Sequence, residues 1–347
     1  MTRKILVHGY DDIISVENLL EAWKEFKNSK RTKEDVALFD RNLMDNIFQL
    51  HRELSDGRYA HSSYKAFKIN DPKPRDIHKA SVRDRLMHHA IYRQLYWFFD
   101  RKFIYDSYSC RVYKGTHKAM DQFRTYFRKV SKNDTRMCWV LRCDIRKFFA
   151  SIDHKILKKV LRSHIQDEKV LLLLDGVVDS FSTAGKPGIG LPLGNLTSQL
   201  LVNVYMNEFD QFVKHKLKQG FYIRYADDFV FLHEDKHRLK NLIPQISEFL
   251  ENELKLFLHP NKVFIKTFAS GVDFLGWVHF PHHRVLRTAT KRRMMNSMSH
   301  APSRHRMGAY LGMLSHGNGR KLARKLDYGI AKKFQEVAFC VQRKSAL

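Results

Sequence analysis

The spacing of apolar residues follows two different periods along this chain, and each period predicts a different kind of element. Apolar residues recur at helical intervals over residues 16–27, 34–54, 81–99, 196–217 and 239–254. Within 34–54, the residues that mark one apolar side are Leu38, Leu43, Ile47, Phe48 and Leu50. Short apolar runs at 139–143, 221–223 and 229–232 are typical of buried strands. The chain is therefore expected to have an α+β fold.

Two adjacent carboxylates lie between two of these apolar runs. Tyr225-Ala226-Asp227-Asp228 separates Phe221–Ile223 from Phe229–Leu232, which predicts a β-hairpin with Asp227 and Asp228 at its tip. Mg²⁺ binds a few carboxylate oxygens and fills its remaining positions with water and substrate phosphate. A pair of aspartates in a turn is also ordinary turn chemistry, so this motif needs support from elsewhere in the chain.

A third carboxylate provides that support. Asp144 ends the strand-like run that begins at Trp139. Phosphoryl transfer with two metal ions about 4 Å apart requires a carboxylate from a neighbouring strand beside the hairpin pair. Asp144, Asp227 and Asp228 together predict such a site, although Asp144 would also suit the N-cap of a helical turn that starts at Ile145.

A glycine-rich segment precedes one of the expected helices. Residues 185–194 contain four glycines and two prolines, so their backbone has few bulky side chains and can approach a base pair closely. The helical spacing begins directly afterwards, and Asn195 or Thr197 is expected to cap that helix. A plain helix start would look similar, so this pattern by itself assigns no role to the junction.

In these motifs the chain resembles the reverse transcriptases, over about residues 60–285. The matching strings are Asp144 with the following Ile145-Arg146-Lys147-Phe148-Phe149, then Gly190 to Gln199, then Tyr225 to Asp228. Leu193-Gly194 with Ser198-Gln199 is similar to the diversity-generating retroelement class. Lys73-Pro74-Arg75 and Lys114-Gly115-Thr116-His117 are also similar to that class.

The resemblance implies a right-hand polymerase with fingers, a ferredoxin-like palm and a helical thumb. Residues 1–135 would form N-terminal helices and fingers. Residues 136–283 would form the palm, with a fingers-side insertion near 165–190, and residues 284–347 a basic helical thumb. There is no sign of a separate RNase H or of a paired-cysteine endonuclease.

The resemblance also implies roles for individual residues. Two Mg²⁺ ions, for which Mn²⁺ would substitute, are expected at Asp144, Ile145, Asp227 and Asp228. The residues expected to bind the nucleotide are Lys73, Arg75, Phe149, Gly194, Ser198, Gln199 and Lys262. Among these, Arg75 would clamp the triphosphate and Phe149 would exclude a ribose 2′-hydroxyl; Lys262 would act near the pyrophosphate. The residues expected to contact template and primer are Arg83, Arg85, Tyr225, Leu275, Gly276, Lys291, Arg292 and Arg293.

Composition agrees with a partner that is a polyanion. The chain has 62 Lys and Arg residues against 36 Asp and Glu, a formal charge of +26. Such a surplus favours nucleic acid through counterion release, although it also serves solubility. The four cysteines show no Cys-x-x-Cys spacing, so they are interpreted as reduced packing residues rather than zinc ligands. No signal peptide or membrane-length apolar run is present, so the protein is expected to be cytoplasmic and not bound to membrane.

The predicted function is RNA-directed DNA synthesis on a structured template RNA, with errors at template adenines. The partners would be template RNA, the cDNA primer-template duplex, dNTPs and a small basic accessory protein. Two alternatives remain. One is another bacterial reverse transcriptase lineage, in antiphage defence or standalone. The other is a non-catalytic basic RNA-binding protein, which gains nothing from three clustered carboxylates that repel one another without metal.

Overall fold

A computed structural model describes residues 6, 9–70, 74–300 and 303–326. The chain divides into two compact units. Unit 1 comprises Met1–Tyr113, Cys143–Phe229 and Leu242–Val263, and unit 2 comprises Lys114–Arg142, Val230–Asn241 and Phe264–Leu347. The expected division into fingers, palm and thumb stays a prediction.

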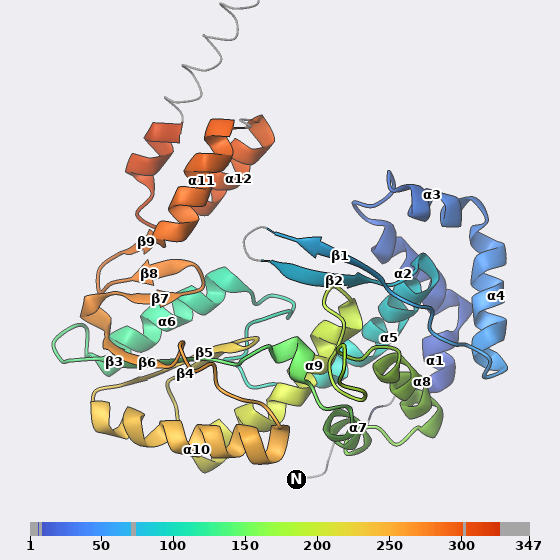
Figure 1. Ribbon diagram of the computed structural model, residues 1–347, viewed down its shortest axis with the longest axis horizontal. Helices are drawn as coiled ribbons and strands as arrows, with labels where there is room; N and C mark the ends of the chain where they lie inside the picture. Colours follow the sequence, from blue (N-terminus) through green and yellow to red (C-terminus); the bar gives the residue numbers. More distant parts are fainter. Residues whose placement is uncertain (1–5, 7–8, 71–73, 301–302, 327–347) are drawn as a thin grey trace, which may run out of the picture. The chain divides into compact units, whose positions relative to one another are not determined.

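Unit 1 is rich in helices (Figure 1). Those formed entirely within it are α1 (Tyr10–Ile14), α2 (Val16–Lys27), α3 (Glu34–Arg41), α4 (Leu43–Ser55), α5 (Val82–Asp100), α7 (His154–Arg162), α8 (Glu168–Asp179) and α9 (Leu196–Gln211). A π-helical turn, Phe212–Lys216, follows α9. Side chains cap the N-termini of four of these helices: Ser15 begins α2, Ser81 α5, Asp153 α7 and Asp167 α8.

Of the five predicted helices, two keep their bounds to within one residue, two form with altered bounds and one is broken. The helix predicted over 16–27 is α2, and the one predicted over 81–99 is α5. The helix predicted over 34–54 is instead two helices, because Asn42 has non-helical backbone angles (φ −114°, ψ 41°). The break changes which side chains face inward, so the single apolar side predicted there is wrong: Ile47 is buried, but Leu38 is 63% exposed.

A four-stranded sheet carries the predicted apolar strands. Its order is β4 (Tyr222–Tyr225), β5 (Asp228–His233), β3 (Trp139–Asp144) and β6 (Phe264–Thr267). Strands β3 and β6 are antiparallel, with Trp139 opposite Thr267. The four residues from Phe229 to Leu232 are at most 2% exposed, which explains why this strand is apolar throughout rather than alternating. Helix α10 (Lys236–Leu254) follows β5 along the chain. A smaller antiparallel sheet in unit 1 pairs β1 (Lys65–Ile69) with β2 (Arg75–Lys79).

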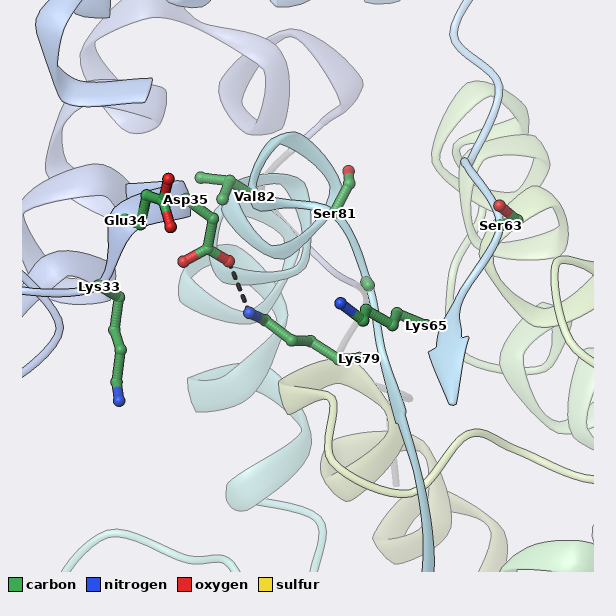
Figure 2. A pocket seen from close by; sticks show the side chains of 9 residues that line it. Lys33, Glu34, Asp35, Ser63, Lys65, Lys79, Ser81 and Val82 are labelled. Atoms are coloured by element: carbon green, nitrogen blue, oxygen red, sulfur yellow. Dashed lines mark hydrogen bonds and ion pairs between the residues drawn. The ribbon is translucent and has the colours of Figure 1, made fainter. Parts of the chain in front are cut away.

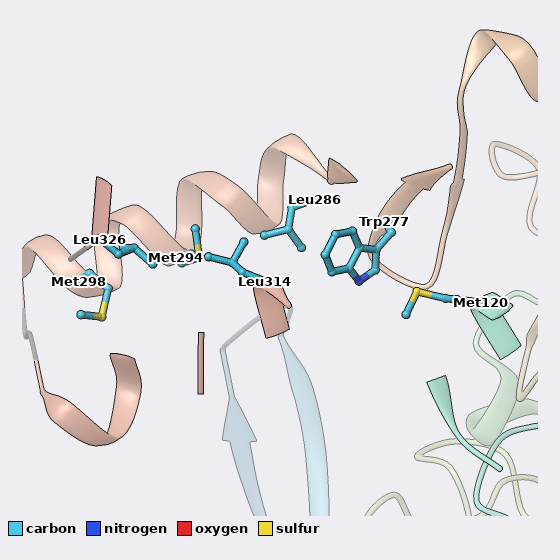
Figure 3. Close-up of a cluster of buried hydrophobic side chains, with 7 residues drawn as sticks. All are labelled: Met120, Trp277, Leu286, Met294, Met298, Leu314 and Leu326. Atoms are coloured by element: carbon cyan, nitrogen blue, oxygen red, sulfur yellow. The ribbon is translucent and has the colours of Figure 1, made fainter. Parts of the chain in front are cut away.

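Unit 2 has its own apolar core. It contains α6 (Thr116–Val130), α11 (Thr288–His300), α12 (Arg304–Leu314) and an antiparallel sheet of β7 (Val272–Phe274), β8 (Trp277–His279) and β9 (Arg284–Leu286). Figure 3 shows the buried side chains that join these elements: Met120, Trp277, Leu286, Met294, Met298, Leu314 and Leu326. The α+β class predicted from the apolar pattern is confirmed.

One expectation about the cysteines needs correction. Cys138 and Cys143 are buried and unbridged, as expected of packing residues, but Cys110 is exposed. Cys340 lies outside the described residues. No helix in the described ranges has the length and apolar content needed to cross a membrane.

Candidate active site

The predicted hairpin forms, and it places two carboxylates at one end of the strands of the sheet. Strand β4 ends at Tyr225 and β5 starts at Asp228, so Ala226 and Asp227 make the turn. Ala226 is in the left-handed region (φ 56°), which a turn of this length requires of at least one residue. Asp227 and Asp228 are half-buried. Two apolar runs around a short polar segment therefore predict the β4–β5 hairpin correctly.

Asp144 lies at the end of the adjacent strand, beside this turn. The Ile145 amide donates a hydrogen bond to the Asp227 carbonyl (3.1 Å), and the His259 amide donates one to the Asp144 carbonyl (2.7 Å). The helical turn after Asp144 begins only at Phe148, with Lys147 at its N-cap. Asp144 therefore belongs to the strand, and the alternative that it caps a helix is wrong.

The charges of Asp144 and Asp228 act on Asp227. Burial and the neighbouring charge of Asp144 raise the pKa of Asp227 to about 6, and the charge of Asp228 also raises it. Like charges held together in this way are stabilised by a divalent cation, and carboxylates are the ligands that Mg²⁺ prefers. The donor set is thus of the right kind for the predicted metal ions.

A lysine forms an ion pair with one of these three carboxylates. The Lys262 ammonium lies 2.8 Å from Oδ1 of Asp144, in an ion pair whose partners are far apart in the sequence. Among the residues that the structure describes, no three His, Cys, Asp or Glu side chains meet in the geometry of a metal site. A cation held by all three aspartates would therefore compete with Lys262 for Asp144.

The glycine-rich loop is tied to the segment that carries Phe149. The Gly190 amide donates to the Ile152 carbonyl (2.7 Å), and the Leu191 amide donates to the Phe149 carbonyl (2.8 Å). Nε2 of His154 forms a further hydrogen bond with the Gly190 carbonyl (2.7 Å). Phe149 is half-buried. The loop thus fixes the backbone of the predicted 2′-hydroxyl gate.

The same loop also reaches the strand that begins with Arg75. The His78 amide donates to the Leu193 carbonyl (3.1 Å), and Nδ2 of Asn195 donates to the His78 carbonyl (3.1 Å). Arg75 is exposed at the start of β2. The structure therefore links the backbones around Arg75 and Gly194, while Lys73 lies outside the described residues.

The start of α9 differs in detail from the prediction. Asn195 is at the N-cap, but its side chain makes no capping bond; Nδ2 donates to the His78 carbonyl, and Oδ1 accepts no helix amide. Thr197 is inside the helix and its hydroxyl lies 2.7 Å from Nδ1 of His88, so the prediction that Thr197 caps is wrong. Ser198 is buried and Gln199 is half-buried.

The predicted template contacts fall into two groups. Arg83 is paired with Glu53, and Arg85 lies 2.6 Å from Asp35, so both cations have carboxylate partners within unit 1. Their assignment to template stays a prediction, as does that of half-buried Tyr225.

In unit 2, two of the residues expected to contact template and primer lie in a tight hairpin. Leu275 and Gly276 form the turn between β7 and β8, both with positive φ (52° and 85°). On α11, Lys291 and Arg292 are exposed and Arg293 is half-buried. Their contact with primer or template stays a prediction.

A hollow of about 580 Å³ lies elsewhere in unit 1. It is lined by Lys33, Glu34, Asp35, Ser63, Lys65, Lys79, Ala80, Ser81 and Val82. Figure 2 shows that Lys79 points to Asp35, with its ammonium 2.6 Å from the carboxylate. None of the predicted nucleotide-binding residues lines this hollow, so it does not mark the nucleotide site.

One buried cation beside the carboxylates was not predicted from the sequence. Arg224 precedes Tyr225 and is completely buried, where it pairs with Asp210. The available signal was a single cation within an otherwise apolar strand. Such a residue requires a buried partner, but nothing in the local pattern identifies Asp210 as that partner.

The chain is similar to several known proteins. Residues 68–279 match the family described as "Reverse transcriptase (RNA-dependent DNA polymerase)". Protein YkfC of Escherichia coli (strain K12) is 26% identical over 294 residues, 73% of this chain and 74% of that protein. The group II intron-encoded protein LtrA of Lactococcus lactis subsp. cremoris is 26% identical over 226 residues, 62% of this chain but only 33% of LtrA. Apo telomerase from Candida tropicalis, truncated from its C-terminal domain, gives a TM-score of 0.49 at 12% identity, over 70% of this chain and 60% of that chain.

Proposed function

The chain belongs to the reverse transcriptase family, and we propose that it is an RNA-directed DNA polymerase of the diversity-generating retroelement type. The observation that carries the proposal is the junction between Asp144 and the hairpin that bears Asp227 and Asp228, where the Ile145 amide bonds the Asp227 carbonyl. Three neighbouring carboxylates at one end of the strands suit nucleotidyl transfer better than passive RNA binding.

The carboxylates would hold the divalent ions that this family uses. Asp144, Asp227 and Asp228 would be the side-chain ligands, with Ile145 beside them. Bound Mg²⁺ would stabilise negative charge on the attacking primer 3′-oxygen and on the departing pyrophosphate. The ion pair with Asp144 (2.8 Å) holds the Lys262 ammonium beside the carboxylates. Lys262 would be the residue placed to donate a proton to the pyrophosphate.

The nucleotide would lie against the backbone network around the glycine-rich loop. Arg75 presents a planar fork with two or more donors, which suits a triphosphate better than a point charge does. Phe149 would exclude a 2′-hydroxyl, and Gly194, Ser198 and Gln199 would meet the base pair. Lys73 would add a second cation beside Arg75.

The assignment to the diversity-generating retroelement class rests on the segment before α9. Leu193 stands where the commoner pattern has a polar Gln, and its carbonyl accepts the His78 amide. Loss of a polar contact to the base pair reduces the free-energy difference between correct and incorrect nucleotides. We infer that Leu193 and Gln199 together allow errors at template adenines. The template would be a structured RNA, with a small basic accessory protein as a further partner.

The test compares Mg²⁺-dependent cDNA synthesis by the unaltered protein with that by Asp227→Asn/Asp228→Asn. The matched control is Asp11→Asn/Asp12→Asn, which changes two adjacent exposed carboxylates in α1. Synthesis should be lost only in the first variant, by at least about a thousandfold, as expected when charge stabilisation in the transition state is removed.

Sequencing of the products then separates the alternatives. Errors concentrated at template adenines support the retroelement class, whereas accurate synthesis indicates another bacterial lineage. Absence of synthesis by the unaltered protein, with co-purified RNA and accessory protein present, would indicate the non-catalytic RNA-binding protein.

A further inference from the structure

A buried ion pair lies next to the turn that joins β4 to β5, which carries Asp227. Arg224 and Asp210 are both 0% exposed. Nε and Nη2 of Arg224 donate to the two carboxylate oxygens of Asp210, at 2.8 and 2.7 Å. The Tyr222 hydroxyl donates to the same carboxylate at 2.8 Å. The pair thus has the two-point geometry that fixes the plane of a guanidinium.

The other donors of Arg224 are also used. Nη1 donates to Oδ1 of Asn203 and to the Ala226 carbonyl, both at 3.2 Å. Nη2 donates to the Ser107 hydroxyl at 3.1 Å. A guanidinium has five N–H donors, and these bonds together with the two to Asp210 use all of them. Lysine has three donors and no planar fork, so it cannot make the same set.

The bond to Ala226 connects this network to the carboxylates. Ala226 is the turn residue before Asp227 and has a left-handed backbone (φ 56°), which alanine adopts only when its surroundings hold it there. The main chain of Arg224 is held as well, because its amide donates to the Asp106 carbonyl (2.9 Å) and its carbonyl accepts the Tyr108 amide (3.0 Å). Both the side chain and the backbone of Arg224 therefore restrain the turn.

Stability alone does not account for such a pair. Removing two charges from water is costly, and apolar residues of similar volume often replace a buried ion pair without loss of stability. What an apolar pair cannot do is donate a hydrogen bond to the Ala226 carbonyl. The arrangement is explained if its benefit is the orientation of the turn.

We propose that Arg224 and Asp210 are positioning residues that hold the Ala226 turn so that Asp227 and Asp228 face the metal-binding side of the site. This rests on the proposed function, because it assumes that these carboxylates bind metal. Neither Arg224 nor Asp210 touches the reacting groups. Their effect passes through the backbone of Ala226 to the adjacent aspartates.

The test uses the double variant Arg224→Met/Asp210→Leu, which leaves no unpaired buried charge and is therefore expected to fold. Arg224→Lys supplies a second variant that keeps the charge and loses the fork. The matched control is Arg162→Met/Asp175→Leu. It removes another Arg–Asp pair of unit 1, on segments that make no hydrogen bond to Arg224 or Asp210.

Binding of Mn²⁺ is titrated by electron paramagnetic resonance on each full-length protein with primer-template and a dNTP, using a dideoxy-terminated primer. Thermal unfolding and primer-template affinity are measured on the same samples. We expect both Arg224 variants to bind Mn²⁺ about tenfold or more weakly, as for residues that orient metal ligands, with unchanged primer-template affinity. The control should bind Mn²⁺ as the unaltered protein does.

A folded double variant with unaltered Mn²⁺ affinity would overturn the proposal, as would equal losses in the control. Failure of the unaltered protein to bind Mn²⁺ would also overturn it. The proposed function fails separately, if the unaltered protein binds Mn²⁺ but does not extend an unblocked primer.

Discussion

Two neighbouring phenylalanines, Phe148 and Phe149, differ in what they can contact. Phe148 is 3% exposed and belongs to the core, whereas Phe149 is half-buried and packs edge-on against it with ring centres 5.6 Å apart. The Phe149 carbonyl accepts the Leu191 amide, so the backbone stays fixed whichever side chain is present. Of the two, Phe149 therefore has both a fixed backbone and a ring that is partly open to solvent.

Phe149→Ala should therefore lower the preference for dNTPs over rNTPs. A smaller side chain admits the 2′-hydroxyl, and we expect the ratio of kcat/KM values to fall by about tenfold or more. Single-nucleotide incorporation with each substrate measures this ratio. Phe148→Leu is the matched control, because it alters only core packing and should leave the ratio unchanged. An unchanged ratio in Phe149→Ala would show that another residue excludes the ribose.

A buried histidine makes stability depend on pH. His88 is 2% exposed, with Nδ1 2.7 Å from the Thr197 hydroxyl and Nε2 3.1 Å from Nε2 of His61. Burial lowers the pKa of His88 to about 3, from an ordinary value of 6.5. Between these two values the unfolded chain binds a proton that the folded chain does not. The stabilisation is complete above pH 6.5 and is lost as the pH falls towards 3.

Acidification from pH 7 to pH 5 should cost about 2 kcal/mol of unfolding free energy through His88 alone. Urea unfolding at the two pH values measures the loss. His88→Gln should show a smaller loss by that amount, although it is less stable at pH 7. Exposed His305→Gln is the control and should keep the full pH dependence. An equal loss in His88→Gln would assign the effect to other groups.

At the level of elements, the loop before α9 depends on a close backbone approach. Gly190 has a φ of 105°, and a Cβ there would lie 2.2 Å from Oγ1 of Thr183. The Thr183 hydroxyl donates to the Ala150 carbonyl (3.0 Å), so it cannot move away without breaking that bond. A side chain at position 190 would therefore displace the loop, and with it the Phe149 segment and the start of α9.

Gly190→Ala and Gly185→Ala separate this effect from backbone strain. Both positions have positive φ, but a Cβ at Gly185 meets nothing within 4 Å. Both variants therefore carry the strain of a non-glycine residue at positive φ, on the order of 1–2 kcal/mol. Only Gly190→Ala should also raise the KM for dNTPs, measured by primer extension at fixed template concentration, by about tenfold. Equal KM values in the two variants would contradict a role for the loop in nucleotide binding.

At the scale of the whole molecule, the dominant property is positive charge. The formal charge of +26 predicts that affinity for nucleic acid falls steeply with salt. Not every cation is available for this, since Arg83, Arg85 and Lys262 each have a carboxylate partner. Exposed Lys291 and Arg292 on α11 remain candidates for phosphate contact.

Lys291→Gln/Arg292→Gln should reduce the slope of log K against log salt by up to about two, or roughly 0.9 for each phosphate that the protein no longer neutralises. Primer-template binding between 50 and 200 mM salt, on the order of physiological ionic strength, measures the slope. Lys158→Gln/Arg162→Gln removes the same charge from two cations already paired with Asp179 and Asp175. That control should leave the slope nearly unchanged, and equal changes in the two variants would indicate an effect of net charge alone.

Local patterns predicted the elements that carry the carboxylates. These elements are the strand that ends at Asp144 and the hairpin around Asp227. Helix α2, elsewhere in unit 1, was predicted in the same way. Each prediction used the apolar spacing within a single element of roughly 20 residues or fewer. Periodicity did not predict the break at Asn42, because a single non-helical residue leaves the apolar spacing almost intact.

The sequence by itself determined the family, the chemistry of the candidate site and the two elements that present it. Only the tertiary structure decided which partners those residues have. Lys262 bonds Asp144 across 118 positions, and Arg224 reaches Asp210 and Ser107 from different segments. The physical reason is that the side-chain period of a helix or strand describes only which residues of that element share a face. The partner of a buried charge depends on how distant segments pack together.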